Sequence, residues 1–408
     1  MTESPDTTSV AKSNAAPAAI HLRPGGDRRL RHGHPWIYSN EIRMDGAAKA
    51  IAPGAAVALH RVDGKPLGVG TFNPHALIAF RMFSEDPHRP LDAGFFAQRL
   101  TQALLLRERL FDAPYYRLVH GESDGLPGLA IDRYGDALAV QTATAGMECL
   151  IEPLLEALDR VLAPSAIVLA NDGGFRALEQ LQTYVRVAKG TIDGPVEVRE
   201  GNLRFLADLM EGQKTGWFYD QRDNRALLAA LARGGRMLDV YCHGGGFAIA
   251  AAVAGGGQTL GIDRSEMALD MARRAADLNG VGDRATFRRA EAFAELERLG
   301  QAGERFDIVC ADPPAFVKSK KDLGPGLKGY EKVTRLAAAL VAPGGFLFLA
   351  SCSHNVEPGQ FAETVAQGLR KAGRTGRILR STGAGPDHPV HPALPESAYL
   401  KAIFLQVD

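Results

Sequence analysis

The sequence has no excess of either charge and few cysteines, and each absence narrows the choice of function. Lysine plus arginine and aspartate plus glutamate both number 47 among the 408 residues, so the whole chain has no electrostatic attraction to nucleic acid. The four cysteines lie tens of residues apart, and no C-x-x-C pair or Cys/His spacing indicates a zinc or iron–sulfur site. Scattered cysteines are typical of a reducing compartment, so we expect a cytoplasmic protein without a bound metal.

Long apolar segments are also missing. No apolar run reaches the ~18 residues that a membrane span needs, so we expect no membrane partner. Residues 1–19 are rich in Ala, Ser, Thr and Pro, and they lack both the features of a signal peptide and the arginines of a transit peptide. We interpret them as a disordered tail.

Positive charge is instead concentrated in two short segments. Residues 21–43 contain five arginines against two acidic residues, and residues 318–335 contain six cations against two. Charge runs are most often solvated faces, but local basic surfaces of this kind could contact RNA phosphates. The predicted RNA contacts are Arg23, Arg28, Arg29, Phe316, Lys318, Lys320 and Lys321.

The hydrophobic pattern changes twice along the chain. Residues 20–86 alternate short β-like runs with Gly, Pro and Asp turns, which predicts a small β-rich domain. Residues 91–195 mix helical and strand patterns, which predicts a middle α/β domain. Residues 196–408 begin with a hairpin pattern and then alternate strands with helices, which predicts βαβ units and a parallel sheet. The predicted strands of that sheet are Arg236–Val240, Gln258–Ile262, Ala285–Arg288, Asp307–Cys310 and Gly345–Leu349.

A glycine-rich turn follows the first of these strands. Met237–Tyr241 leads into Cys242–Phe247, where glycines allow a tight turn and the close approach of a ligand. Asp263, after the second strand, can accept hydrogen bonds from ribose hydroxyls, and Glu291, after the third, could reach an adenine amino group or simply cap a helix. The pattern alone fits nicotinamide, flavin or S-adenosylmethionine (SAM), although the G-x-G-x-x-G spacing of pyrophosphate sites is absent.

Two further motifs follow the fourth and fifth strands. Asp312-Pro313-Pro314-Ala315-Phe316 is typical of methyl transfer to a planar nitrogenous group, in which Phe316 stacks on the base. Ser351-Cys352-Ser353 adds a thiol at the same mouth of the sheet. A thiolate can attack C6 of a pyrimidine and activate C5 for methylation, while Asp312 acts at N3. With Ser353 and Asn355 as potential caps of the next helix, we expect the Cys352 thiol to be more acidic than a buried one.

Several segments resemble one family, the bacterial ribosomal RNA large-subunit cytosine-5 methyltransferases. The resemblance rests on Gln213–Arg225, His120–Asp136, Asp312–Phe316, Ser351–Ser353 and Asp387-His388-Pro389, and it covers the chain from about Ile20. It implies an N-terminal PUA domain, a middle α/β domain and a Rossmann-like class I SAM methyltransferase domain. It also implies methylation of a cytosine in 23S-type ribosomal RNA, with Cys352 as the nucleophile.

The site residues can then be assigned. The predicted catalytic residues are Cys352 and Asp312. The predicted SAM-binding residues are Gln213, Lys214, Thr215, Gln221, Arg222, Asp239, Tyr241, Gly244, Gly245, Gly246, Phe247, Asp263, Glu291 and Asp312. Arg222 and Arg225 could contact the cofactor or RNA phosphates, or be exposed helix charges. Family members usually carry Thr at Gly244 and commonly Asp at Glu291.

Three alternatives stay open. The enzyme could methylate an amino or ring nitrogen of ribosomal RNA, with Cys352 incidental. The chain could instead be an RNA-binding ribosome-assembly factor with a degenerate cofactor pocket, motivated by Gly244 and Glu291. A nicotinamide-dependent enzyme is disfavoured by the glycine spacing. The partner is ribosomal RNA or a large-subunit particle, and the β-rich start could support a homodimer.

Overall fold

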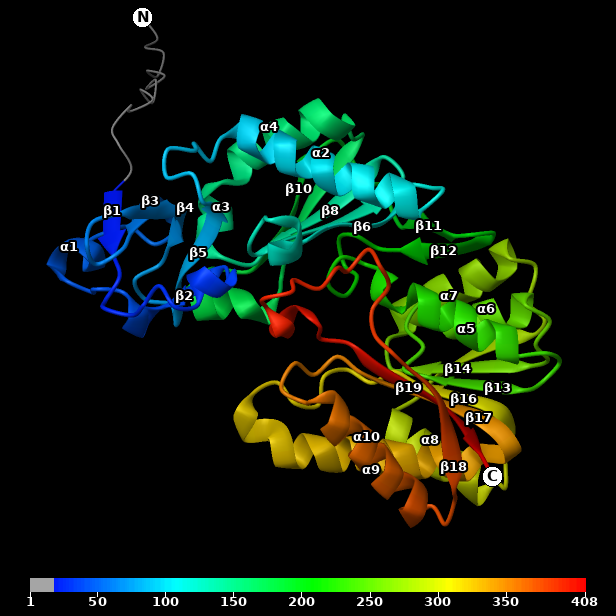
Figure 1. Ribbon diagram of the computed structural model, residues 1–408. Helices are drawn as coiled ribbons and strands as arrows, with labels where there is room; N and C mark the ends of the chain where they lie inside the picture. The colour runs from blue at the N-terminus through cyan, green and yellow to red at the C-terminus, as the bar shows by residue number, and fades with distance from the viewer. Residues whose placement is uncertain (1–17) are drawn as a thin grey trace, which may run out of the picture. The chain divides into compact units, whose positions relative to one another are not determined.

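The computed structural model describes residues 18–408 (Figure 1). The chain divides into two compact units, Met1–Leu91 and Asp92–Asp408. The predicted tail lies outside the described residues except for Ala18 and Ala19, which belong to the first strand.

The first unit is a five-stranded sheet with the order β1-β3-β4-β5-β2. Strands β1 and β3 are parallel, and the other neighbours are antiparallel. Its elements are β1 (Ala18–His21), η1 (Leu30–His32), β2 (Trp36–Tyr38), η2 (Ser39–Glu41), α1 (Gly46–Lys49), β3 (Ala55–His60), β4 (Pro66–Phe72) and β5 (Ile78–Ser84). The β-rich character predicted from the sequence is confirmed, while β1 and β2 are too short to give a periodic signal.

The second unit begins with another five-stranded sheet, in the order β10-β9-β8-β7-β6. Helices α2 and α4 lie side by side over one face of it (Figure 1). The elements are α2 (Ala93–Leu110), β6 (Tyr115–His120), η3 (Gly121–Asp124), β7 (Leu129–Tyr134), β8 (Ala137–Thr142), α3 (Ala145–Cys149), α4 (Ile151–Leu162), β9 (Ala166–Asn171), η4 (Gly174–Glu179) and β10 (Tyr184–Lys189). Residues 145–162 form two helices rather than one, because the backbone at Leu150 leaves helical geometry (φ −105°, ψ 16°).

The hairpin predicted next is present as β11 (Val196–Glu200) and β12 (Leu203–Ala207). It is followed by η5 (Tyr219–Gln221) and α5 (Arg222–Leu231). These elements precede the larger sheet in the chain, and they carry several residues of the site described below.

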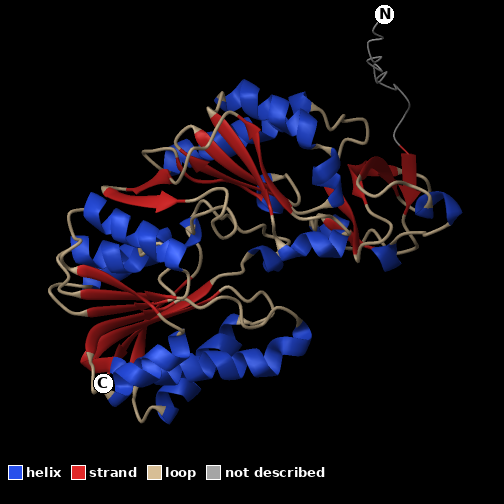
Figure 2. Ribbon diagram, turned by 180° about the vertical axis from the view of Figure 1, so that it is seen from behind, coloured by secondary structure: helices blue, strands red, loops and turns tan. Residues whose placement is uncertain are grey.

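The larger sheet has seven strands in the order β15-β14-β13-β16-β17-β19-β18. All neighbouring strands are parallel except β19, which runs antiparallel to β17 and β18. Helices cover both faces, as Figure 2 shows. The elements are β13 (Met237–Val240), α6 (Gly246–Val253), β14 (Thr259–Asp263), α7 (Glu266–Leu278), β15 (Ala285–Arg289), α8 (Ala292–Gln301), β16 (Phe306–Ala311), η6 (Lys320–Asp322), α9 (Leu323–Leu340), β17 (Val341–Ser351), α10 (Pro358–Lys371), β18 (Gly376–Thr382), η7 (Pro395–Ser397) and β19 (Lys401–Val407).

The five strands predicted for this sheet are confirmed, and the order places β13 and β16 side by side at its centre. Because the crossover from β15 returns to the other side of β13, the carboxyl ends of β13, β14 and β16 surround a switch point where such folds bind ligands. The glycine turn and the Asp312 motif both emerge there.

A buried ion cluster joins the smaller sheet to the segment before β19. The guanidinium of Arg107, fully buried on α2, donates to both carboxylate oxygens of Asp124 (2.6 and 2.8 Å) and to the carbonyl of Asp387 (2.9 Å). The Asp387 carboxylate accepts from the backbone N–H of Arg117 (3.0 Å). These contacts explain why the two sheets belong to one compact unit.

Candidate active site

The glycine turn begins where β13 ends. Three residues in it have positive φ: Tyr241 (67°), His243 (48°) and Gly245 (76°). Gly245 precedes α6, and a Cβ at this position would lie 2.8 Å from the Phe287 ring, so glycine is required for both backbone and space. The turn therefore brings the first turn of α6 directly to the carboxyl edge of the sheet, where backbone N–H groups can face a ligand carboxylate.

Asp239, inside β13, forms a hydrogen bond to the helix that follows this turn. Its Oδ2 accepts from the backbone N–H of Ala248 in α6 (3.1 Å). The side chain is buried, and burial raises its pKa to about 7. Asp239 thus fixes the helix to the strand.

The two carboxylates predicted to meet the cofactor lie at the ends of the next two strands. Asp263 accepts from the backbone N–H groups of His243 (3.0 Å) and Ser265 (2.9 Å), and a carboxylate keeps further lone pairs for ribose hydroxyls. Glu291 is exposed and caps α8 by accepting from Ala294 N–H (2.9 Å). Both carboxylates act on Tyr241, whose pKa is raised by burial first and then by these charges.

A buried ion pair lies under the glycines. Arg225 donates from Nε to Glu200 (2.9 Å) and from Nη2 to the same carboxylate, and Trp217 Nε1 donates to Glu200 Oε1 (2.8 Å). A Cβ on Gly246 would lie 2.9 Å from Arg225 Cδ, and one on Gly244 would lie 3.2 Å from the Trp217 ring. The expectation that Arg225 is an exposed charge or a phosphate contact is wrong, because its side chain is 4% exposed and neutralised by Glu200.

Other residues of the Gln213–Arg225 block have protein partners. Thr215 is buried and donates to Asp132, and the half-buried Arg222 donates to the carbonyl of Tyr115 and lies over the rings of Phe111 and Tyr219. These contacts position the block, and the roles of Thr215 and Arg222 in cofactor binding stay predictions. Gln213 and Lys214 are exposed, and Lys214 Nζ lies 5.0 Å from the Phe218 ring centre.

Asp312 follows β16 and is held by the same block. Gln221 Nε2 donates to Asp312 Oδ2 (2.8 Å). Gln221, a predicted cofactor residue of η5, thus contacts a predicted catalytic residue. Burial, then the nearby Asp220 carboxylate, raises the pKa of Asp312 to about 7. The group can therefore exchange a proton near neutral pH.

Cys352 follows β17, which runs parallel to β16, so thiol and carboxylate emerge at one edge of the sheet. The thiol is half-buried, while Cys242 in the glycine turn and Cys310 in β16 are buried. Burial and then the charge of Asp312 raise the pKa of the Cys352 thiol, and Lys214 opposes them only in part. Burial raises the pKa of Cys242 and of Cys310 well above the usual value, so Cys352 is more acidic than these buried thiols, as expected.

The neighbouring Ser353 does not have the capping role expected for it. Ser353 is buried and accepts from the backbone N–H of Val317 (3.1 Å), and its hydroxyl shares a hydrogen bond with Tyr330 (2.8 Å). It does not cap the next helix, which begins at Pro358 with Glu357 as its cap. The helix that follows Cys352 therefore begins six residues after the thiol, and Ser353 does not bring its N-terminus to the sulfur.

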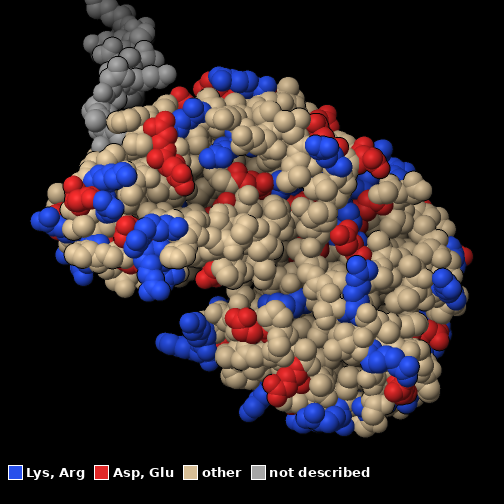
Figure 3. Space-filling model, in the orientation of Figure 1, with Lys and Arg blue, Asp and Glu red and all other residues tan. Residues whose placement is uncertain are grey.

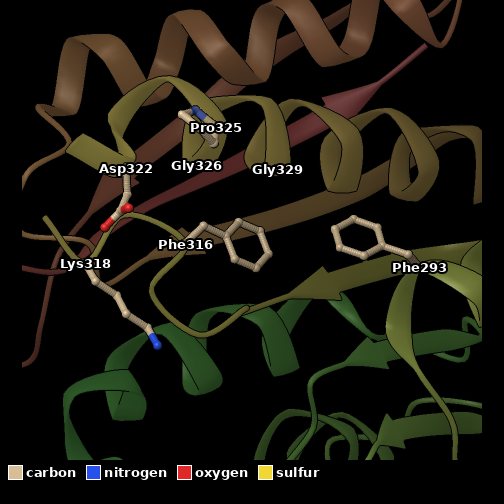
Figure 4. Close-up of a pocket in the computed structure, with 7 residues that line it drawn as sticks. All are labelled: Phe293, Phe316, Lys318, Asp322, Pro325, Gly326 and Gly329. Carbon is tan, nitrogen blue, oxygen red and sulfur yellow. The ribbon is translucent and has the colours of Figure 1, made fainter. Parts of the chain in front are cut away.

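Phe316 lines a cavity of about 390 Å³ (Figure 4). Its ring lies 4.8 Å from Tyr330 and 6.2 Å from Phe293, centre to centre. Phe316 and Phe293 face this hollow together with Lys318 and Asp322, so the predicted stacking residue stands in an aromatic wall beside the start of α9.

The charged residues among the predicted RNA contacts are exposed but lie in different units. Lys318, Lys320 and Lys321 precede α9, and Figure 3 shows cationic side chains projecting over that region. In the first unit, Arg29 pairs with Glu41 (3.1 Å), and Arg23 donates to the carbonyl of Ile42 (3.1 Å). Arg28 is exposed beside them.

Sequence reasoning missed two residues next to the sulfur. Asp220 is buried and accepts from the hydroxyl of Tyr399 (2.5 Å). The charge of Asp220 acts on Cys352, and the charge of Cys352 acts on Tyr399. The sequence offered one indication, because Asp220 directly precedes Gln221 in the Gln213–Arg225 block that carries the family resemblance. Lys401, also near the sulfur, is held by the carbonyls of Ser353 and Tyr399.

Residues 18–408 contain neither a membrane-spanning helix nor a cluster of metal ligands. No helix there is both long and apolar enough to cross a membrane. Within the same range, no three His, Cys, Asp or Glu side chains come together as a metal site would require.

Comparison with known proteins identifies the family. A family model of a PUA-like domain matches residues 20–85, and one of an S-adenosylmethionine-dependent methyltransferase matches residues 186–404. The chain is 37% identical over 396 residues to ribosomal RNA large subunit methyltransferase I of Aeromonas hydrophila, covering 95% of this chain and 99% of that protein. The corresponding protein of Shewanella denitrificans is 35% identical over 393 residues, with the same coverage.

Solved structures agree on the fold. A putative SAM-dependent methyltransferase from Streptococcus mutans matches with a TM-score of 0.81 at 18% identity, covering 95% of this chain and 100% of that chain. Another match with the same values is a putative methyltransferase complexed with SAH. The predicted PUA-like and Rossmann-like folds are confirmed, and SAM is the cofactor. The chain belongs to the ribosomal RNA large subunit methyltransferase I family of SAM-dependent methyltransferases.

Proposed function

We propose that this enzyme methylates C5 of a cytosine in large-subunit ribosomal RNA through a covalent bond between Cys352 Sγ and C6. The observation that carries the proposal is the placement of Cys352 and Asp312 at the ends of adjacent parallel strands, within electrostatic reach of each other. Relatives that match nearly the whole chain are named for large-subunit ribosomal RNA.

The residues at the carboxyl edge fit the cofactor. The glycine turn leaves no side chain between the ligand and the start of α6, Asp263 keeps lone pairs for hydroxyl groups, and Glu291 lies at the end of the neighbouring strand. When bound, SAM supplies the methyl group.

The protein's own groups then divide the chemistry. Cys352 must lose its proton to attack C6, and because burial raises the pKa of this thiol, a neighbouring group must take the proton; the Asp312 carboxylate can accept it. Asp312, with a pKa of about 7, can donate its proton toward N3 as electrons from C6 move into the ring. Gln221 holds that carboxyl group in place.

A cysteine bonded to the base distinguishes this reaction from nitrogen methylation. We propose to incubate the protein with SAM and a 23S ribosomal RNA transcript containing 5-fluorocytosine, whose fluorine cannot leave C5 as a proton does. A denaturation-resistant protein–RNA adduct should form with the natural enzyme and be absent in Cys352→Ala. A Cys352→Ala variant that methylates natural RNA at the natural rate would favour the nitrogen acceptor.

The setting of the reaction follows from its substrate. Ribosomal RNA is made and assembled in the cytoplasm of bacteria, so we place the enzyme there.

Dimerisation through the first unit stays a prediction, which sedimentation of the purified protein tests. The proposed boundary between middle and methyltransferase domains near residue 196 would be tested by expressing residues 91–195 alone.

A further inference from the structure

The proposed reaction needs a base that nothing above assigns. Once C5 carries the methyl group, its hydrogen must leave as a proton before Cys352 can be released. Ala315 stands directly after the two prolines, so no second thiol is available there. The base must be another group close to Cys352.

Asp220 has the required environment. It is 7% exposed and lies in η5, one residue before the glutamine that holds Asp312. One carboxylate oxygen, Oδ2, accepts from the Tyr399 hydroxyl, while the other, Oδ1, is buried without any hydrogen-bond partner. Buried polar atoms are almost always paired, so an unpaired carboxylate oxygen at a reaction site needs an explanation.

The charge of Asp220 reaches both reacting groups. It contributes to the raised pKa of Cys352 and is the first charge acting on Asp312. Asp220 therefore lies near both reacting groups.

The other groups near the sulfur are less suited to accept a proton. Lys401 donates to two carbonyls, and Lys214 is a cation. Burial raises the pKa of Tyr399 well above its usual value, so its hydroxyl remains a donor. Burial also raises the pKa of Tyr330, whose hydroxyl is bonded to Ser353.

We propose that Asp220 is the catalytic base that removes the C5 proton, an inference that rests on the proposed function. The C5–H bond breaks and its proton passes to Asp220 Oδ1. The electron pair of that bond forms the C5=C6 double bond, and the C6–S bond breaks with its electrons returning to Cys352 as a thiolate. The proton on N3 returns to Asp312. The proton leaves Asp220 for water after the RNA departs. Tyr399 is a positioning residue, because it acts through Oδ2.

The test uses Asp220→Asn with natural 23S ribosomal RNA transcript and SAM. Methyl transfer in the first turnover should stay within a few-fold of the natural enzyme, while turnover falls about 100-fold or more, as expected for loss of a general base. A methylated, denaturation-resistant adduct should accumulate, and tritium at C5 should not be released. The exposed Asp223, three residues further along, provides a matched Asp223→Asn control that should form no adduct.

Two outcomes overturn the assignment. One is turnover by Asp220→Asn at the natural rate, and the other is loss of methyl transfer without an adduct in a variant that still binds SAM in calorimetry. If Asp220→Asn does not bind SAM, Asp220→Glu decides, because a retained carboxylate should restore turnover above that of Asp220→Asn, and no restoration refutes the role. If the natural enzyme forms no adduct with 5-fluorocytosine RNA, the proposed function itself fails. If it does form one and only the Asp220→Asn trap fails, only this inference fails.

Discussion

The ion pair beneath the glycine turn offers the strongest test of how the cofactor site is supported. Changing Glu200 to Ala removes the carboxylate that neutralises Arg225 and accepts from the Trp217 indole. Both charged side chains are about 5% exposed or less, so the guanidinium would stay buried without a partner. Breaking a buried pair in this way costs about 3–5 kcal/mol, and the orphaned indole N–H adds roughly 1–3 kcal/mol.

The loss should be measurable by denaturant unfolding. The chain has two tryptophans, and in a Trp36→Phe background the fluorescence reports Trp217 in the second unit. We expect the free energy of unfolding to fall by about 4 kcal/mol or more in Glu200→Ala. Because Trp217 and Arg225 contact the positions of Gly244 and Gly246, SAM affinity should also fall by about tenfold or more in calorimetry.

Two variants control this experiment. Glu197, on the same strand, pairs with the exposed Arg199 and Arg204, so Glu197→Ala should cost less than about 1 kcal/mol. Replacing the pair together, as Glu200→Met with Arg225→Met, should recover most of the loss because no charge stays buried. A Glu200→Ala protein as stable as Glu197→Ala would refute the reasoning.

Two further predictions concern titration. Burial raises the pKa of Asp239 to about 7, above its value in the unfolded chain. Protonated Asp239 therefore stabilises the folded protein fully below about pH 4, and this contribution, on the order of 4 kcal/mol, is lost as pH rises through 7. In unfolding measured from pH 4 to 8, Asp239→Asn should show a smaller loss of stability with rising pH. The raised pKa of Cys352 predicts slow alkylation by iodoacetamide at pH 7, rising about tenfold per pH unit to pH 9, and Asp312→Asn should accelerate it at pH 8 by removing a negative charge. A pH-independent alkylation rate, or stability in Asp239→Asn that still falls with pH as in the natural protein, would contradict these assignments.

The central sheet could be predicted because its signals are local. Strands β13 to β17 are short apolar runs separated by helical patterns, and the glycines mark the turn at Gly245 directly. The edge of the sheet was therefore predictable, including the meeting of Asp312 and Cys352.

What could not be predicted depends on contacts between distant segments. Arg225 reads as a helix charge until Glu200, on another element, is seen to neutralise it. Ser353 was expected to cap the next helix, but its hydroxyl forms hydrogen bonds with Val317 and Tyr330 instead. The role of Asp220 could not be predicted because its hydrogen-bond partner, Tyr399, lies 179 residues further along the chain.

The position of β19 has a consequence for synthesis. This strand lies between β17 and β18 although it follows both in the chain, and Lys401 at its start pairs with Ser351 beside the reactive thiol. A growing polypeptide that has reached only β18 therefore leaves the edge of β17 open and the sulfur without its bracing strand. We therefore expect the emerging enzyme to stay inert until residues 401–407 have left the exit tunnel and joined the sheet.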